Sequence, residues 1–78
     1  MRQKQLKLII TFHTTTCAMA MEKQCRLNDI RGRIIPVPRA ISAGCGLAWM
    51  AEIEDEAMLI AQMEASDIAY SAIQECLI

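Results

Sequence analysis

The chain of 78 residues contains very few aromatic side chains: one Phe, one Trp and one Tyr. Proteins that bind single-stranded nucleic acid stack bases on exposed aromatic rings, so that class of function is not expected here. The chain also has no large net charge that could attract a phosphate backbone, because its eight basic residues are offset by nine acidic ones. We therefore expect no nucleic-acid partner.

Metal-binding motifs are also missing. The one histidine is His13, and no two cysteines form a C-x-x-C pair; the four are Cys17, Cys25, Cys45 and Cys76. A structural zinc site needs four such ligands at close spacings, so we expect no metal and no cofactor.

Two kinds of targeting segment are absent as well. The N-terminus lacks the features of a signal peptide, and no apolar run is as long as a membrane-spanning helix. The sequence thus predicts a cytoplasmic protein without a membrane partner, in which the four thiols stay reduced.

The composition is that of one small globular domain covering residues 1–78, with 54% hydrophobic and 22% charged residues. The charges are divided unevenly along the chain. All eight basic residues lie at or before Arg39 together with two acids, which gives 8 − 2 = +6, and the rest carries seven acids and no base, or −7. This asymmetry indicates an anion site, attraction between subunits, or two faces that neutralise each other within the fold.

Hydrophobic patterning predicts a strand followed by a helix in the first third of the chain. Residues 6–12 alternate, with the side chains of Leu6, Leu8, Ile10 and Phe12 on one face. The threonines at 14–16 are typical of a helix N-cap, and Ala18, Met21 and Cys25 recur at helical spacing. Asn28 or Asp29 can adopt the left-handed conformation that ends such a helix.

The remaining two thirds predict a strand, a second strand, a helix and a last strand. Residues 33–38 are β-branched but include Pro36 and Pro38, which lack amide donors and belong at a sheet edge. Residues 47–51 read as a strand, and the acids from 52 to 56 favour the start of a helix that reaches about residue 65. An apolar band of Ala57, Leu59, Ile60, Ala61 and Met63 marks its buried face, and residues 68–75 read as the last strand.

This order predicts a ferredoxin-like βαββαβ fold of the α+β class: a two-layer sandwich of a four-stranded antiparallel sheet and two helices on one face. The strand order would be 4-1-3-2. The other sheet face would be open, and because the chain is apolar and Trp49 lies on the third strand, we expect a second subunit to cover it. A homo-oligomer is therefore predicted.

The loop between residues 36 and 48 holds the strongest candidate for chemistry. Cys45 lies between Gly44 and Gly46, which leave its sulfur unshielded and can direct backbone amides at an anion. Arg39 could stabilise a thiolate or an anionic sulfur adduct. From spacing alone, the competing interpretation is a tight turn in which Cys45 is only a small apolar filler.

The motif Ile35-Pro36-Val37-Pro38-Arg39-x-Ile41-Ser42-x-x-Cys45-Gly46-Leu47-Ala48 resembles the signature of the selenium/sulfur-carrier-like family of small bacterial proteins. The resemblance runs from about Lys7 to Ile73. The chain differs where the family has a glycine after the first helix, here Asn28-Asp29, and a proline near the second, here Ile53.

The resemblance implies a carrier that holds persulfide, or a selenide adduct, on Cys45 and works with a donor of the cysteine-desulfurase type or with an acceptor protein. We assign Arg39 as anion stabiliser, with Ser42 and the amides from Gly44 to Gly46 as hydrogen-bond donors to the outer atom. His13 is a further candidate, as a base, because the end of the first strand lies near the start of the third in such a sheet.

An accessory carrier is favoured over an enzyme that turns over a substrate. The alternative function is a regulatory or scaffold module that oligomerises through its sheet and binds a small anion or a partner at the Arg39–Gly46 loop, with Cys45 incidental.

Overall fold

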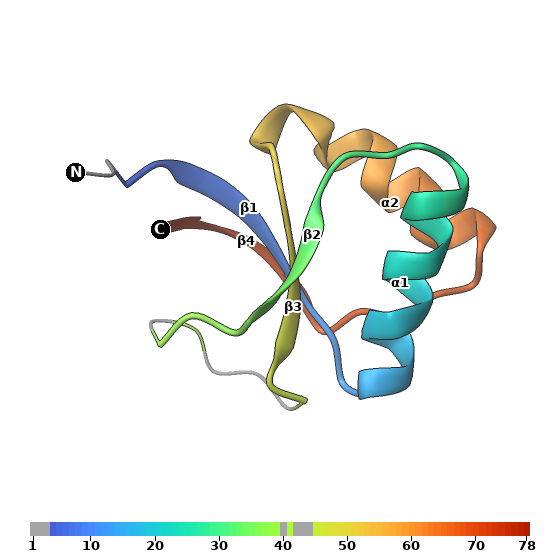
Figure 1. Cartoon of the computed structure of the whole chain (residues 1–78), viewed down its shortest axis with the longest axis horizontal. Helices are drawn as coiled ribbons and strands as arrows, with labels where there is room; N and C mark the ends of the chain where they lie inside the picture. Colours follow the sequence, from blue (N-terminus) through green and yellow to red (C-terminus); the bar gives the residue numbers. More distant parts are fainter. Residues whose placement is uncertain (1–3, 40, 42–44) are drawn as a thin grey trace.

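A computed structural model describes residues 4–39, 41 and 45–78. All strand pairings in this part of the chain are antiparallel, the strand order is β2-β3-β1-β4, and both helices cover one side of the sheet (Figure 1). This confirms the predicted α+β two-layer fold and its strand order. The elements are β1 (Leu6–Thr11), α1 (Thr15–Leu27), β2 (Arg33–Pro36), β3 (Leu47–Ala51), the 3-10 turn η1 (Ile53–Asp55), α2 (Glu56–Ala65) and β4 (Ala72–Leu77).

Helix α1 begins where the threonines predict. Thr14 has an extended backbone, with φ −133°, and its side-chain oxygen accepts a hydrogen bond from the Cys17 amide at 3.2 Å. This N-cap satisfies one of the free amides in the first turn. The buried residues of α1 are Ala18, Met21 and Cys25, as their helical spacing predicted.

Both helices end in the same way, at an aspartate in the left-handed region. Asp29 and Asp67 each have φ 56°. Both ends are Schellman motifs, in which the amide after the left-handed residue donates to a carbonyl five positions earlier. The bonds run from Ile30 to Cys25 at 2.8 Å and from Ile68 to Met63 at 2.9 Å.

The core between the helices and the sheet, here the helix-side core, contains Leu8, Ile10 and Phe12 from β1 and the residue after it. Helix α2 contributes Leu59 and Met63, which are buried. The band predicted for α2 was too broad, because Ala57 and Ala61 are exposed. A ten-residue helix at the edge of a small core buries only a narrow stripe.

Trp49 belongs to this helix-side core, so it adds no apolar surface to the open sheet face and does not support the expected second subunit there. In the register of the sheet it lies beside Ile10 and Ile34, and only 2% of it is exposed. Its indole nitrogen is buried without an acceptor in the described residues. Gly32 passes so close that an added Cβ would stand 2.6 Å from this nitrogen, which explains a glycine before β2.

The opposite sheet face has a smaller apolar cluster of its own, here the loop-side cluster. Ile9 and Ala48 are fully buried, and Ile41, from the loop after β2, packs over them with 8% of its surface exposed. The chain thus covers the centre of this face itself, where a second subunit was expected. The homo-oligomer stays a prediction.

The last strand lies further along the chain than predicted, at Ala72–Leu77 instead of 68–75. Ile68 is buried against the helix-side core as the final residue of the α2 Schellman motif. The chain then needs three residues to reach the sheet, where the Ser71 amide donates to the Thr11 carbonyl at 2.7 Å. The apolar residue that suggested a strand start serves to end the helix.

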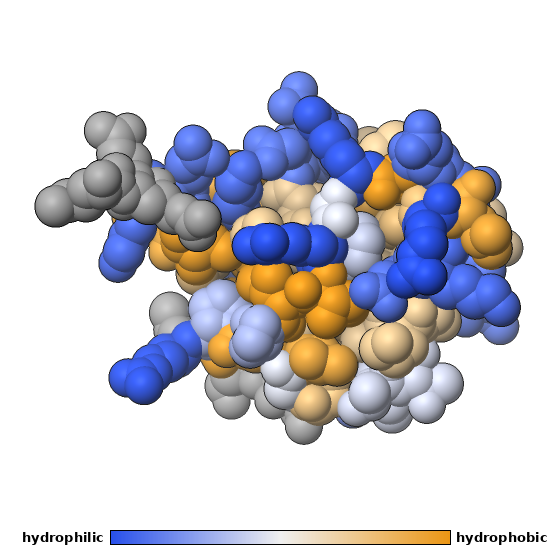
Figure 2. Space-filling view, in the orientation of Figure 1, coloured by the Kyte–Doolittle hydropathy of each residue, from blue (hydrophilic) through white to orange (hydrophobic). Residues whose placement is uncertain are grey.

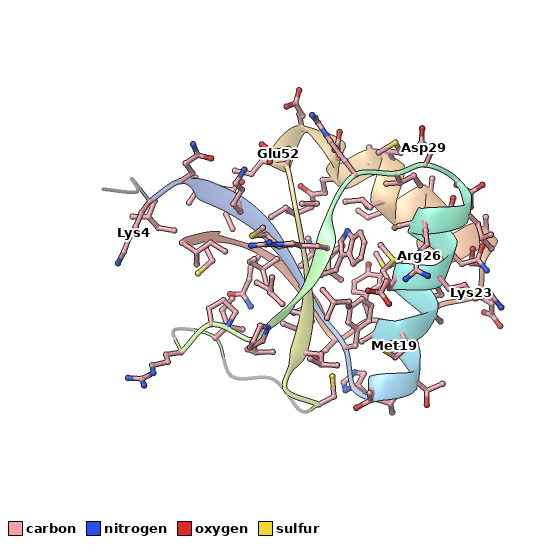
Figure 3. All side chains as sticks on the ribbon, in the orientation of Figure 1. Lys4, Met19, Lys23, Arg26, Asp29 and Glu52 are labelled. Carbon is pink, nitrogen blue, oxygen red and sulfur yellow. The ribbon has the colours of Figure 1, made fainter. Side chains whose placement is uncertain are left out.

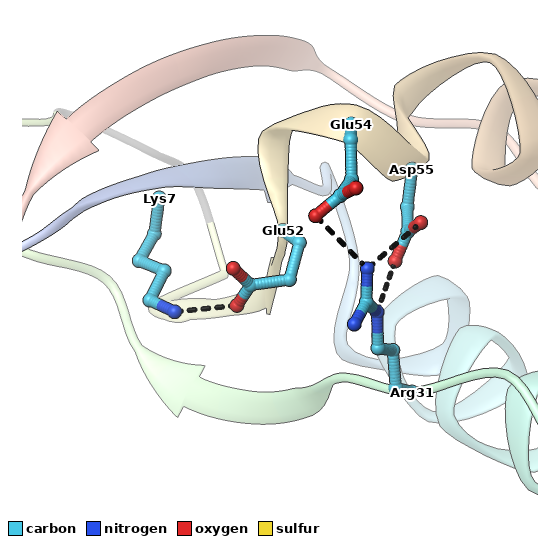
Figure 4. A network of polar contacts seen from close by, with 5 residues as sticks. All are labelled: Lys7, Arg31, Glu52, Glu54 and Asp55. Atoms are coloured by element: carbon cyan, nitrogen blue, oxygen red, sulfur yellow. Dashed lines mark hydrogen bonds and ion pairs between the residues drawn. The ribbon is translucent and has the colours of Figure 1, made fainter.

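The charge split is partly neutralised within the fold (Figure 4). Lys7 pairs with Glu52, and Arg31 bridges Glu54 at 3.2 Å and Asp55 at 2.7 Å. The hydrogen bond to Asp55 and the charge of that carboxylate raise the pKa of Arg31 above its usual value. Basic residues of the first half therefore meet acids of the second half, as one of the three interpretations of the charge pattern proposed.

Candidate functional site

The candidate site lies in the loop of the β2–β3 hairpin. Pro36 and Leu47 form the last residue pair between β2 and β3, and just beyond it the Val37 amide donates to the Gly46 carbonyl at 3.0 Å. Gly46 has φ 80°, while no atom lies within 4 Å of the position where its Cβ would be. A glycine is therefore favoured here by its backbone conformation and not by lack of space.

Cys45 is half-buried at the end of this loop. Its Sγ donates a hydrogen bond to the carbonyl of Leu47 at 3.4 Å, and its side chain packs against the helix-side core. The thiol is therefore less bare than its glycine neighbours suggested. A thiol is a weak donor, so this contact positions the sulfur without holding it strongly.

Arg39 is exposed in the turn that follows Pro38, where the Ile41 amide donates to the Pro38 carbonyl at 2.9 Å. Its guanidinium forms no ion pair with any residue of the described ranges. Ser42 and Gly44, which we predicted as hydrogen-bond donors to a bound sulfur, lie outside the described residues. Their roles stay predictions.

His13 lies at the same end of the sheet as the Cys45 loop. Thr11 pairs with Ala48, so the residues just after β1 and just before β3 are neighbours in the fold. His13 is exposed there, and within 4–39, 41 and 45–78 it makes no hydrogen bond to Cys45. The topology gives His13 the predicted location, and its role as a base stays a prediction.

The other three cysteines have different surroundings. Cys25 is fully buried in α1, and this burial raises the pKa of its thiol to about 11. Cys25 is therefore protonated at neutral pH and a poor nucleophile. Cys17, in the first turn of α1, and Cys76, against the loop-side cluster, are half-buried.

Two features of the site were missed by the sequence interpretation. The Leu47 carbonyl accepts the Cys45 hydrogen bond, and no side-chain pattern could have identified a backbone group. Ile41 fixes the loop to the sheet, and here a signal existed: it is the one large apolar residue among small ones between Arg39 and Gly46.

Two cavities lie at the opposite end of β2 from Cys45. One, of about 300 Å³, lies between α1 and the sheet beside Trp49, and the other, of about 210 Å³, lies beside Met50; Gly32 and Arg33 line both. In the described part of the chain no three His, Cys, Asp or Glu residues are grouped so as to hold a metal. Neither α1 nor α2 combines the length and apolar composition needed to cross a bilayer.

Comparison with known families gives one match. The family described as "Putative Se/S carrier protein-like" matches residues 7–75. The chain belongs to this family. The match includes β1 from Lys7 onward, both helices and the whole Cys45 loop, which agrees with the resemblance seen in the motif. No curated protein and no solved structure matches the chain significantly.

Proposed function

We propose that this member of the Se/S-carrier-like family holds a transferable sulfur or selenium atom on Cys45. The observation that carries the proposal is the position of Cys45: a half-buried thiol at the end of a hairpin loop, in a chain whose family match includes that loop. A carrier thiol must be reached by two partners in turn. A loop at the end of a sheet provides such access, whereas the buried Cys25 does not.

The proposed transfer is an exchange of the outer sulfur between a persulfide and a thiolate, with no net oxidation or reduction. The Cys45 thiolate attacks the outer sulfur of a donor persulfide, so that a new S–S bond forms on Cys45 while the donor's S–S bond breaks. The donor cysteine leaves as a thiolate, and Cys45 becomes a persulfide. An acceptor thiolate then removes the outer sulfur by the same reaction, and the Cys45 thiolate is restored.

Arg39 and the loop amides supply charge and hydrogen bonds in this proposal. The outer sulfur of a persulfide is anionic at neutral pH, and the guanidinium of Arg39 is exposed and free of ion pairs with described residues. An arginine with no other partner can turn toward such an anion. Ser42 and the amides from Gly44 to Gly46 would bind the same atom, and His13 would accept the proton of the Cys45 thiol.

The test is to incubate the protein with a cysteine desulfurase and free cysteine and to measure the mass of each cysteine-containing peptide. We expect one added sulfur on Cys45 and none in the Cys45→Ser variant. Cys76→Ser is the matched control, because Cys76 is also half-buried and its loss should leave the addition unchanged. Absence of the added sulfur, or equal addition to all four cysteines, would overturn the proposal.

Arg39→Gln tests the role of the arginine, with Lys23→Gln as a control that removes one exposed positive charge on α1. We expect slower sulfur addition to Cys45 only in Arg39→Gln. If Cys45 alkylates no faster than the other thiols at any pH and never takes up sulfur, the alternative of a scaffold that binds a partner or anion at this loop is favoured.

A further inference from the structure

The basic residues of the chain divide into two groups when they are sorted by their ion pairs. Lys7, Arg26 and Arg31 pair with carboxylates. Among the described residues, four other cations are exposed and form no ion pair: Lys4, Lys23, Arg33 and Arg39. The charge of this second group is available to a partner.

Three of these four cations belong to segments outside the helices. Arg33 pairs with Met50 in the sheet and so shares the face of the loop-side cluster. Arg39 lies in the Cys45 loop, and Lys4 precedes β1 at the end of the molecule that the helices do not cover (Figure 3). Lys23 is the exception, because it lies on the side of α1 that points away from the sheet (Figure 3).

The acids without an ion pair in the described ranges have the opposite distribution. Most belong to the helices or their ends: Asp29, Glu56, Glu64 and Asp67, with Glu75 on β4 the exception. The molecule is thus polarised. Its helical side carries free negative charge, and its loop and open sheet face carry free positive charge.

Between the free cations lies apolar surface. Ile35, Val37 and Met50 pack against the loop-side cluster but stay half-buried, and Figure 2 shows hydrophobic atoms in the middle of the view, over β2, bordered by hydrophilic side chains. An apolar centre with a charged border is the usual anatomy of a protein–protein interface.

We propose that the surface bounded by Lys4, Arg33 and Arg39 docks an acidic face of the protein that donates sulfur to Cys45. The inference rests on the carrier function proposed above and adds the chemistry of its partner. Complementary charge raises the rate of encounter, and here it would orient the donor over the loop that holds the thiol. The free acids on the helical side would repel the same donor, so that it approaches from one side.

The experiment compares two sources of sulfur on the same variants. A cysteine desulfurase with free cysteine must dock, whereas inorganic polysulfide is a small donor that needs no docking surface. The test variant is Lys4→Glu with Arg33→Glu, which reverses two border charges and leaves Arg39 and Cys45 intact. Lys23→Glu is the matched control, because it reverses a free charge outside the surface.

We expect the Lys4→Glu/Arg33→Glu variant to take sulfur from the desulfurase about tenfold more slowly than the natural protein, and to lose most of its salt dependence. Loading by polysulfide should be unchanged in rate, and the buried Cys25 should stay unloaded, which shows that the variant is folded. Lys23→Glu should resemble the natural protein with both donors.

Three outcomes would overturn the docking proposal: an unchanged desulfurase rate, an equal loss in Lys23→Glu, or salt-sensitive self-association that Arg33→Glu abolishes, which would make a second copy the occupant. Failure of the carrier function is distinguishable from these. In that case polysulfide does not load Cys45 even in the natural protein, and both proposals fall together.

Discussion

The two faces of the sheet are covered to different extents and by different means. The helix-side core is covered by two helices, whose backbones are fixed by their own hydrogen bonds. Among the described residues, Ile41 from the loop that also bears Cys45 packs over the loop-side cluster, and Ile35, Val37 and Met50 around it stay half-buried. A helix fixes the face that it covers through its own hydrogen bonds, whereas loops in general relax more easily. Cys45, the candidate carrier residue, lies at the end of the loop.

The largest expected effect on stability comes from two neighbouring residues of β1. Ile10 and Ile9 are both fully buried but point to opposite faces, toward the helices and toward the loop. We expect Ile10→Ala to lower the free energy of unfolding by about 4 kcal/mol and Ile9→Ala by about 2 kcal/mol, because the loop can move in to fill part of the cavity. Urea unfolding measures both, and equal losses would show that the faces are equally rigid.

A second test removes the loop's own anchor. Ile41→Ala should lower the free energy of unfolding by about 2 kcal/mol. This is the low end for such a truncation, since a loop relaxes more easily than a helix. It should also expose Cys76, which packs against the same cluster, and leave Cys25 protected under the helices. Alkylation of each cysteine in the folded protein would show this, and acceleration at Cys25 instead would mean that the two faces are coupled.

The smallest expected effect concerns pH. Burial raises the pKa of Cys25 to about 11 from 9.0, because the helix-side core disfavours the thiolate. Between these two values the unfolded chain releases the proton and the folded chain keeps it, so the stability falls as the pH rises from about 9 to 11. The free energy of unfolding of each protein is measured from pH 8 to pH 11 and compared with its own value at pH 8. Its fall should be smaller in Cys25→Ala than in the natural protein. An equal fall in both proteins would contradict the raised pKa of the Cys25 thiol.

Much of the fold could be predicted because it is encoded locally. The spacing of Ala18, Met21 and Cys25 predicted the buried face of α1, and the threonines predicted its start. Its end was predicted at Asn28 or Asp29, and Asp29 is the left-handed residue. The prolines after Arg33 placed β2 at an edge, as observed. Each of these signals acts within one turn or one strand, so it is present in the sequence before the chain folds.

The errors concern contacts between distant residues. Nothing near Ile41 indicates that it packs over Ile9. The alternation of side chains along β3 shows which residues share a face with Trp49, but not whether that face is covered by the helices. At the candidate site the motif identified Cys45 and Arg39, yet the bond from Cys45 to the Leu47 carbonyl depends on loop geometry that composition does not determine. The roles of Ser42, Gly44 and His13 stay predictions.

The strand order has one more consequence, which concerns how the chain assembles. If the sequence is divided in the Cys45 loop, one half holds β1, α1 and β2 and the other holds β3, α2 and β4. The pairings are β2 with β3, β3 with β1, and β1 with β4, so every one of them joins one half to the other. Among the described residues neither half has a strand pair of its own, and the halves carry opposite formal charges of +6 and −7. The sheet is in effect an intramolecular complex of two complementary fragments, drawn together by charge and tethered by the loop that carries Cys45.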